Sequence, residues 1–73
     1  MSEDNKMAQA KESFSMQLNA IAKLRDGQAD KLCDYYLEAG LAAYDPRKGI
    51  ITVKNAVYLN ADTIKQIAHK ILR

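Results

Sequence analysis

The 73-residue chain contains a single cysteine, Cys33, so no disulfide can form within it. A chain of this length buries only about 60% of the surface that its unfolded form exposes, and small proteins of oxidising compartments usually add disulfides to compensate. We therefore expect a cytoplasmic protein. Long apolar runs are also missing: no stretch approaches the roughly 20 residues of a membrane-spanning helix, and the N-terminus lacks a signal-peptide pattern. We expect no membrane partner.

Side chains that carry chemistry are scarce as well. The chain has one histidine, His69, and Cys33 falls on an apolar stripe, where a free cysteine usually packs as a small hydrophobe. A zinc site needs three or four converging donors, and none of the usual partners accompanies the histidine. A phosphate-binding loop needs clustered glycines, whereas Gly27, Gly40 and Gly49 stand far apart. We therefore predict no enzymatic activity, no catalytic residue, no metal site and no cofactor.

Apolar residues are plentiful, at 48% of the chain against 27% charged, which is typical of a globular chain with a core. Residues 1–5 have no periodic apolar positions, so we predict a disordered tail there and a single domain over residues 6–73. A first helix is predicted over 6–25 and is ended by Asp26-Gly27, because glycine readily takes the left-handed conformation that closes helices. Its core stripe consists of Met7, Ala10, Phe14, Leu18 and Ile21.

Two further helices are predicted from the same spacing of three and four. One covers 28–39, with Gly40 directly after its last residue. Its stripe consists of Ala29, Leu32, Cys33, Tyr36 and Leu37. The other covers 61–72, and the side chain of Asn60 or Asp62 caps its free amides. Its stripe consists of Ile64, Ile67, Ala68 and Ile71.

A β-hairpin is predicted between the second and the last helix. Turn-forming residues occupy 45–49, and β-branched residues follow them. We therefore predict that 42–44 pair with 50–53. A turn at 54–56 and a short extended link at 57–59 complete the chain. The predicted fold class is α+β, in the order helix, helix, β-hairpin, helix.

Positive charge is concentrated in the second part of the chain. Residues 1–44 carry 5 basic and 7 acidic groups, a net −2, whereas residues 45–73 carry 6 and 2, a net +4. Basic side chains neutralise phosphates and release counterions, which supplies most non-specific affinity for nucleic acid. The candidate nucleic-acid-binding residues are Arg47, Lys48, Lys54, Lys65, Lys70 and Arg73. His69 shares the outer face of the last helix. The alternative, an ordinary solvated face, stays open.

Residues 28–53 combine a helix, the pair Gly40-Leu41, a polar turn at 45–49 and a strand at 50–53. In these features the stretch resembles the end of a winged helix-turn-helix domain, in which the recognition helix is followed by a hairpin wing. The resemblance implies a small winged-helix-like fold that binds DNA.

Carried over residue by residue, the resemblance places Arg47 and Lys48 on the wing. It implies a groove-facing set of Gln28, Lys31, Asp34, Tyr35 and Glu38. Carboxylates facing phosphate are repelled, and Asp30, Asp34 and Glu38 all fall on this exposed face. We therefore expect DNA contact at the hairpin tip and the last helix.

Two functions stay open at this point. The first is a small DNA-binding or transcription-regulatory module. The alternative is a protein-binding adaptor or inhibitor, of the kind found among phage and mobile-element accessory proteins, that binds a host protein or a second copy of itself. Its candidate residues are Met16 and Leu24, which lie off the apolar stripe of the first helix, and Tyr35. We also expect a homodimer, because exposed apolar side chains favour association.

Overall fold

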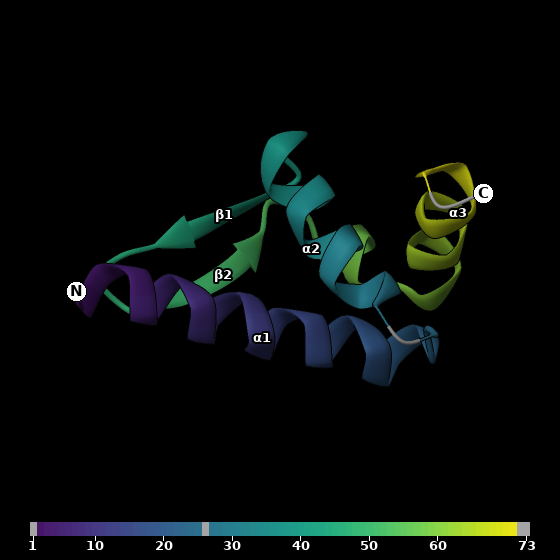
Figure 1. Cartoon of the computed structure of the whole chain (residues 1–73). Helices are drawn as coiled ribbons and strands as arrows, with labels where there is room; N and C mark the ends of the chain where they lie inside the picture. Colours follow the sequence, from purple (N-terminus) through teal and green to yellow (C-terminus); the bar gives the residue numbers. More distant parts are fainter. Residues whose placement is uncertain (1, 26, 72–73) are drawn as a thin grey trace.

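The computed structural model describes residues 2–25 and 27–71, which form three α-helices, one short 3-10 helix and a two-stranded antiparallel hairpin (Figure 1). The elements in chain order are α1 (Ser2–Ala22), α2 (Gln28–Glu38), β1 (Ala42–Asp45), β2 (Ile50–Val53), the 3-10 helix η1 (Ala56–Leu59) and α3 (Ala61–Ile71). The predicted α+β class and the order helix, helix, hairpin, helix are confirmed. Of the helices described, none is both long and apolar enough to cross a bilayer.

Helix α1 supports most of the fold, because it contacts β2, α2 and α3 in turn from its N-terminal to its C-terminal end (Figure 1). Its fully buried apolar residues are Ala10, Phe14, Leu18 and Ala22. These residues are spaced four apart, and each step of four residues advances about 40° beyond one full turn. The row of buried residues therefore winds around the helix, as the element that covers it changes along the chain. The prediction that Ile21 belongs to the core stripe is therefore wrong: Ile21 is 37% exposed, and Ala22 takes its place.

Both ends of α1 differ from the sequence prediction. The helix begins at Ser2, so residues 2–5, which the pattern placed in a tail, are helical. Asn5 and Lys6 are exposed, and polar residues give the pattern no apolar periodicity to detect. The helix ends at Ala22 instead of residue 25.

Lys23, and not Gly27, closes α1. Lys23 has the left-handed φ of 53°, and its backbone N–H donates to the carbonyl of Asn19 at 2.7 Å. Gly27, with φ of 82°, instead precedes the first residue of α2. The connection is fixed by Gln28, whose backbone N–H donates to the carbonyl of Arg25 at 3.1 Å and whose side-chain Oε1 accepts from the Arg25 N–H at 3.1 Å. Helix α1 therefore ends at a lysine in the left-handed conformation, four residues before the glycine.

Gly40 closes α2 as predicted, with φ of 76°. The backbone N–H of Leu41 donates to the carbonyl of Tyr36 at 2.9 Å, and that of Gly40 donates to the carbonyl of Leu37 at 3.3 Å. These two bonds define a Schellman motif, which satisfies the last carbonyls of the helix. Leu41 packs against the core and directs the chain into β1.

The hairpin pairs Ala42 with Val53 at one end and Asp45 with Ile50 at the other, close to the predicted register. The Asp45 carboxylate accepts from the backbone N–H of Arg47 at 2.9 Å, which orders the turn locally.

The link between β2 and α3 is a 3-10 turn, so the prediction of an extended segment at 57–59 is wrong. Asn55 Oδ1 accepts from the Val57 N–H at 3.0 Å and starts η1. Asn60 Oδ1 accepts from the Asp62 N–H at 2.9 Å, which identifies Asn60 as the residue that caps α3. An asparagine at each end favours a tight turn over an extended chain, because its side chain satisfies backbone amides locally.

Tyr36 on α2 is the centre of the core, with 0% of its surface exposed. Its ring packs edge to face against Phe14 at 5.7 Å and against Tyr58 at 6.2 Å between ring centroids. Its hydroxyl donates to the carbonyl of Tyr58 at 2.8 Å. Burial raises the pKa of Tyr36 to about 12. This residue therefore joins α1, α2 and η1, and through η1 it positions α3.

Candidate nucleic-acid interface

The basic residues predicted to bind nucleic acid lie at two ends of the molecule. Arg47 and Lys48 occupy the hairpin turn, hereafter the tip, beside the N-terminal half of α1 (Figure 1). Lys65 and Lys70 are exposed on α3, which packs near the C-terminal end of α1 (Figure 1). The molecule extends 34 Å along its longest axis. The structure therefore does not gather the predicted residues into one surface.

Two other predicted residues belong to neither group. The backbone N–H of Lys54 donates to the carbonyl of Leu41 at 2.9 Å, and its Nζ lies 4.0 Å from the position that a Cβ on Gly40 would take. The ammonium thus sits near the C-terminal end of α2, where the helix dipole favours a cation. This contact is a structural reason for a basic residue at position 54. Arg73 lies outside the described residues.

A cleft of about 280 Å³ lies between α3 and the connection from α1 to α2. Its lining consists of Ala22, Lys23, Leu24, Gln28, Lys65, Ala68 and His69. Lys65 and His69 are one turn apart on the same face of α3, and Lys23 comes from the other wall. Ala22 and Ala68 are small and buried, which lets the walls approach. Among the residues that the structure describes, the lining includes two lysines, a histidine and a glutamine.

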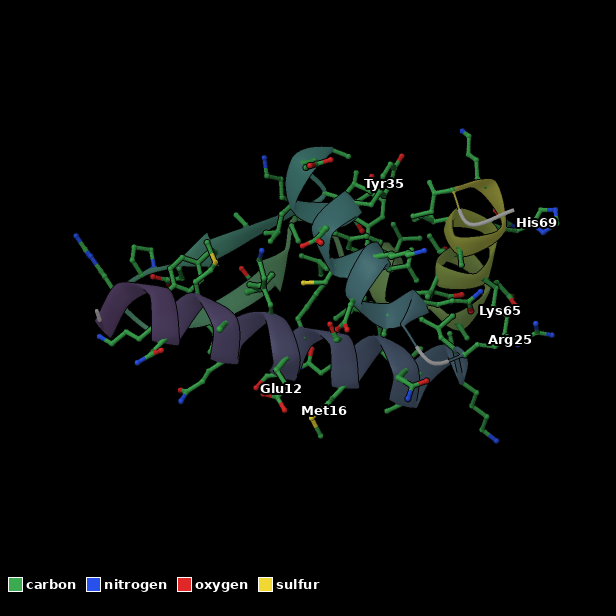
Figure 2. The ribbon with its side chains drawn as sticks, in the orientation of Figure 1. Glu12, Met16, Arg25, Tyr35, Lys65 and His69 are labelled. Atoms are coloured by element: carbon green, nitrogen blue, oxygen red, sulfur yellow. The ribbon has the colours of Figure 1, made fainter. Side chains whose placement is uncertain are left out.

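Arg25 extends the positive charge beyond the cleft. Figure 2 shows Arg25, Lys65 and His69 at the same end of the molecule, where α3 meets the chain after α1. Arg25 and Lys70 are exposed. We call this region, which comprises Lys23, Arg25, Lys65, His69 and Lys70, the basic end.

Lys23 and Arg25 are the residues of the basic end that sequence reasoning missed. The charge count assigned them to the acidic half of the chain, and the predicted helix continued through them to residue 25. The signal that was available is that no apolar stripe residue follows position 21, so the connection begins before Gly27. Their proximity to Lys65 could not be predicted, because it depends on how α3 packs against α1.

The backbone of Lys23 is strained. A non-glycine residue with a φ of 53° is uncommon, and the left-handed conformation costs on the order of 1 kcal/mol more for a lysine than for glycine. The strain is located at the wall of the cleft, because Lys23 both ends α1 and lines the cleft.

The acidic face of α2 differs in kind from the basic end. Asp30, Asp34 and Glu38 are exposed there. Among the described residues, the ion pair present joins Asp34 to Lys11 of α1 at 3.3 Å, and both side chains are largely solvated. Such a pair contributes little to stability.

The residues that the winged-helix resemblance placed toward the DNA groove do not share one environment in the structure. Lys31, Asp34 and Glu38 are exposed, whereas Gln28 lines the cleft and Tyr35 packs against the core. The resemblance itself stays a prediction.

The residues predicted to bind a protein partner do not share one surface. Met16 is 66% exposed, whereas Leu24 and Tyr35 are partly buried and pack against the core. Figure 2 shows Met16 beside Glu12 on the free side of α1 and Tyr35 on the other side of the molecule. Of these three predicted residues, Met16 is therefore the one whose side chain is mostly exposed to solvent.

No other chemistry competes with the basic end in the part of the chain that the structure describes. There, no three histidine, cysteine or carboxylate side chains come together as a metal site requires. Cys33 is buried, and burial together with nearby Asp34 raises the pKa of its thiol, which disfavours the reactive thiolate. Comparison of the chain with protein-family models, with curated proteins and with solved structures finds no match. The functional proposal therefore rests on geometry and charge.

Proposed function

We propose that the protein is a small DNA-binding module with a regulatory role, and that it contacts DNA phosphates through the basic end. The observation that carries the proposal is that Lys23, Lys65 and His69, from two distant chain segments, line one cleft. Arg25 lies at the same end of the molecule (Figure 2), and both Arg25 and Lys70 are exposed. Cations that converge on one concave surface are suited to phosphate, because each contact releases counterions from the nucleic acid.

The acidic face of α2 limits the side from which DNA can approach the protein. Asp30, Asp34 and Glu38 would be repelled by the phosphate backbone, so DNA approaches the basic end from the side away from that face. The exposed tip, with Arg47 and Lys48, is the competing contact site. Two matched pairs of basic residues therefore allow a direct test.

The test is a titration of a fluorescent duplex at several salt concentrations, read by anisotropy. The variants Arg25→Ala/Lys65→Ala and Arg47→Ala/Lys48→Ala each remove two positive charges, one pair from each end. We expect the first to reduce the slope of log affinity against log salt by about 2, since each phosphate contact contributes roughly 0.9. The second should leave the slope nearly unchanged. No binding at low salt would reject DNA binding, and the reverse pattern would move the contact to the tip.

A second candidate function is protein binding through Met16, which is 66% exposed on the free side of α1. A second copy of the chain is the first partner to test. Sedimentation over a concentration series should show association that Met16→Asp abolishes, because a charge would be buried in the contact. A monomer at every concentration would reject self-association.

A further inference from the structure

The size of the cleft in the basic end limits what it can hold. About 280 Å³ lies just below the roughly 300 to 1,000 Å³ of typical small-molecule pockets. A phosphate group fits within this volume, with room for part of the molecule that carries it. A flat ridge of cations would instead suit the side of a duplex, with several phosphates in contact at once.

Residues that carry hydrogen-bond donors line the cleft on both walls. Lys23 and Lys65 each carry an ammonium group, and His69 carries a ring N–H. The Gln28 Oε1 already accepts from the Arg25 N–H, so the amide NH₂ is the part of that side chain that donates. Charge-assisted hydrogen bonds of this kind are the strong ones in anion recognition.

The strained conformation of Lys23 is an independent observation that points to the same place. A glycine would take a φ of 53° with less strain, and it would end α1 equally well. Strained residues are concentrated at ligand sites, where the side chain is needed in spite of the backbone cost. Because Lys23 both bears the strain and lines the cleft, its ammonium is the feature that glycine could not replace.

We infer that this cleft is a discrete binding pocket for a single phosphate group, held by Lys23, Lys65, His69 and Gln28. The inference rests on the proposed function for the natural source of the phosphate, which is a nucleic-acid strand. A free nucleoside monophosphate has the same chemistry, and the experiment separates the two sources.

The first experiment is an NMR titration of the ¹⁵N-labelled protein at constant ionic strength with inorganic phosphate, a nucleoside monophosphate and the corresponding nucleoside. Phosphate and the monophosphate should shift the amide resonances of Lys23, Gln28 and His69 and saturate, whereas the nucleoside should not. Resonances of Arg47 and Lys48 at the tip serve as the internal control and should not move. Absence of saturable shifts, or equal shifts at the tip, would overturn the inference.

The second experiment uses Lys23→Gly, which removes the ammonium and relieves the backbone strain together. Phosphate affinity should fall about tenfold, as loss of one charge-assisted bond predicts, while the Tm should rise by a few degrees. Lys23→Asn, which keeps a residue tolerant of the left-handed conformation, should lose the same affinity. The control Lys48→Ala should change neither quantity. Unchanged affinity in Lys23→Gly, or a lower Tm, would contradict the inference.

Comparison with the duplex titration separates the pocket from the proposed function. If phosphate and the monophosphate bind in the cleft and the duplex does not bind at low salt, the pocket is supported, its source is a free nucleotide, and DNA binding fails. If the duplex binds while neither small ligand shifts the cleft resonances, DNA binding holds and the discrete pocket is overturned.

Discussion

The tip and the basic end both carry positive charge but are built in different ways. At the tip, Arg47 and Lys48 are sequence neighbours in a turn that is ordered by the Asp45 carboxylate. At the basic end, Lys23 and Lys65 belong to different elements and meet only because α3 packs against the end of α1. A turn alone therefore places neighbouring charges at one point of the surface, whereas packing of two elements brings charges from distant parts of the chain to one open cleft.

The largest expected effect comes from weakening the packing of α3, the helix that forms one wall of the basic end. Ile64 is 0% exposed and anchors α3 in the core. Ile64→Ala should lower the free energy of unfolding by about 2 to 5 kcal/mol, since it leaves a cavity as well as removing buried apolar surface. Urea unfolding followed by circular dichroism measures the loss. The matched change Ile50→Ala, at a 43% exposed residue next to the tip, should cost much less. Equal losses would show that α3 is not held by this contact.

Tyr36 links the basic end to the rest of the core, and its effect comes next in size. Tyr36→Phe removes the bond to the Tyr58 carbonyl and should cost about 1 to 3 kcal/mol, because that carbonyl loses its partner in a partly buried site.

The raised pKa of Tyr36 adds a pH dependence to the same prediction. The folded-state pKa is about 12 against an ordinary 10, so the unfolded chain loses its phenolic proton first as pH rises. The contribution of Tyr36 is fully present below pH 10 and disappears as pH approaches 12. Urea midpoints between these values should therefore fall more steeply for the parent protein than for Tyr36→Phe. Parallel curves would contradict the assigned pKa.

Single charge reversals sharpen the comparison with a smaller effect. Lys65→Glu places a carboxylate in the cleft and should weaken duplex binding about tenfold or more at low salt, whereas Lys48→Glu at the tip should weaken it only slightly. Both positions are exposed, so both variants should keep the Tm of the parent. A stronger effect at Lys48 would assign the DNA contact to the tip.

The smallest expected effects have opposite signs at the two ends. Gly49 ends the turn of the tip with φ of 66°, so Gly49→Ala should destabilise the protein by about 1 kcal/mol through backbone strain. Lys23→Gly relieves the corresponding strain at the basic end and should stabilise it by about 0.5 to 1 kcal/mol. Thermal unfolding of both variants gives the signs. If both variants changed the stability in the same direction, backbone strain would not explain the two effects.

Local turn chemistry explains which parts of the fold could be predicted. Gly40 and the turn at 45–49 act through their own backbone and immediate neighbours, and the structure places both as expected. The 3-10 turn at Ala56–Leu59 was missed, and an extended link was predicted at 57–59 in its place. The signal for the turn is also local, because the asparagines on either side cap short turns. The prediction for Ile21 failed for another reason. Which face of α1 is buried near its end depends on where α3 packs, and periodicity does not contain that information.

The sequence by itself determined the α+β class, the hairpin and the excess of positive charge after residue 44, because these follow from residue type and spacing. It also supplied Lys65 and Lys70 as basic residues on the outer face of the last helix. Only the tertiary structure decided that Lys23 takes a strained conformation and that its side chain lines a cleft with Lys65 and His69. The physical reason is distance: residues remote in the chain become neighbours through core packing around Tyr36 and Ile64, which no local pattern encodes.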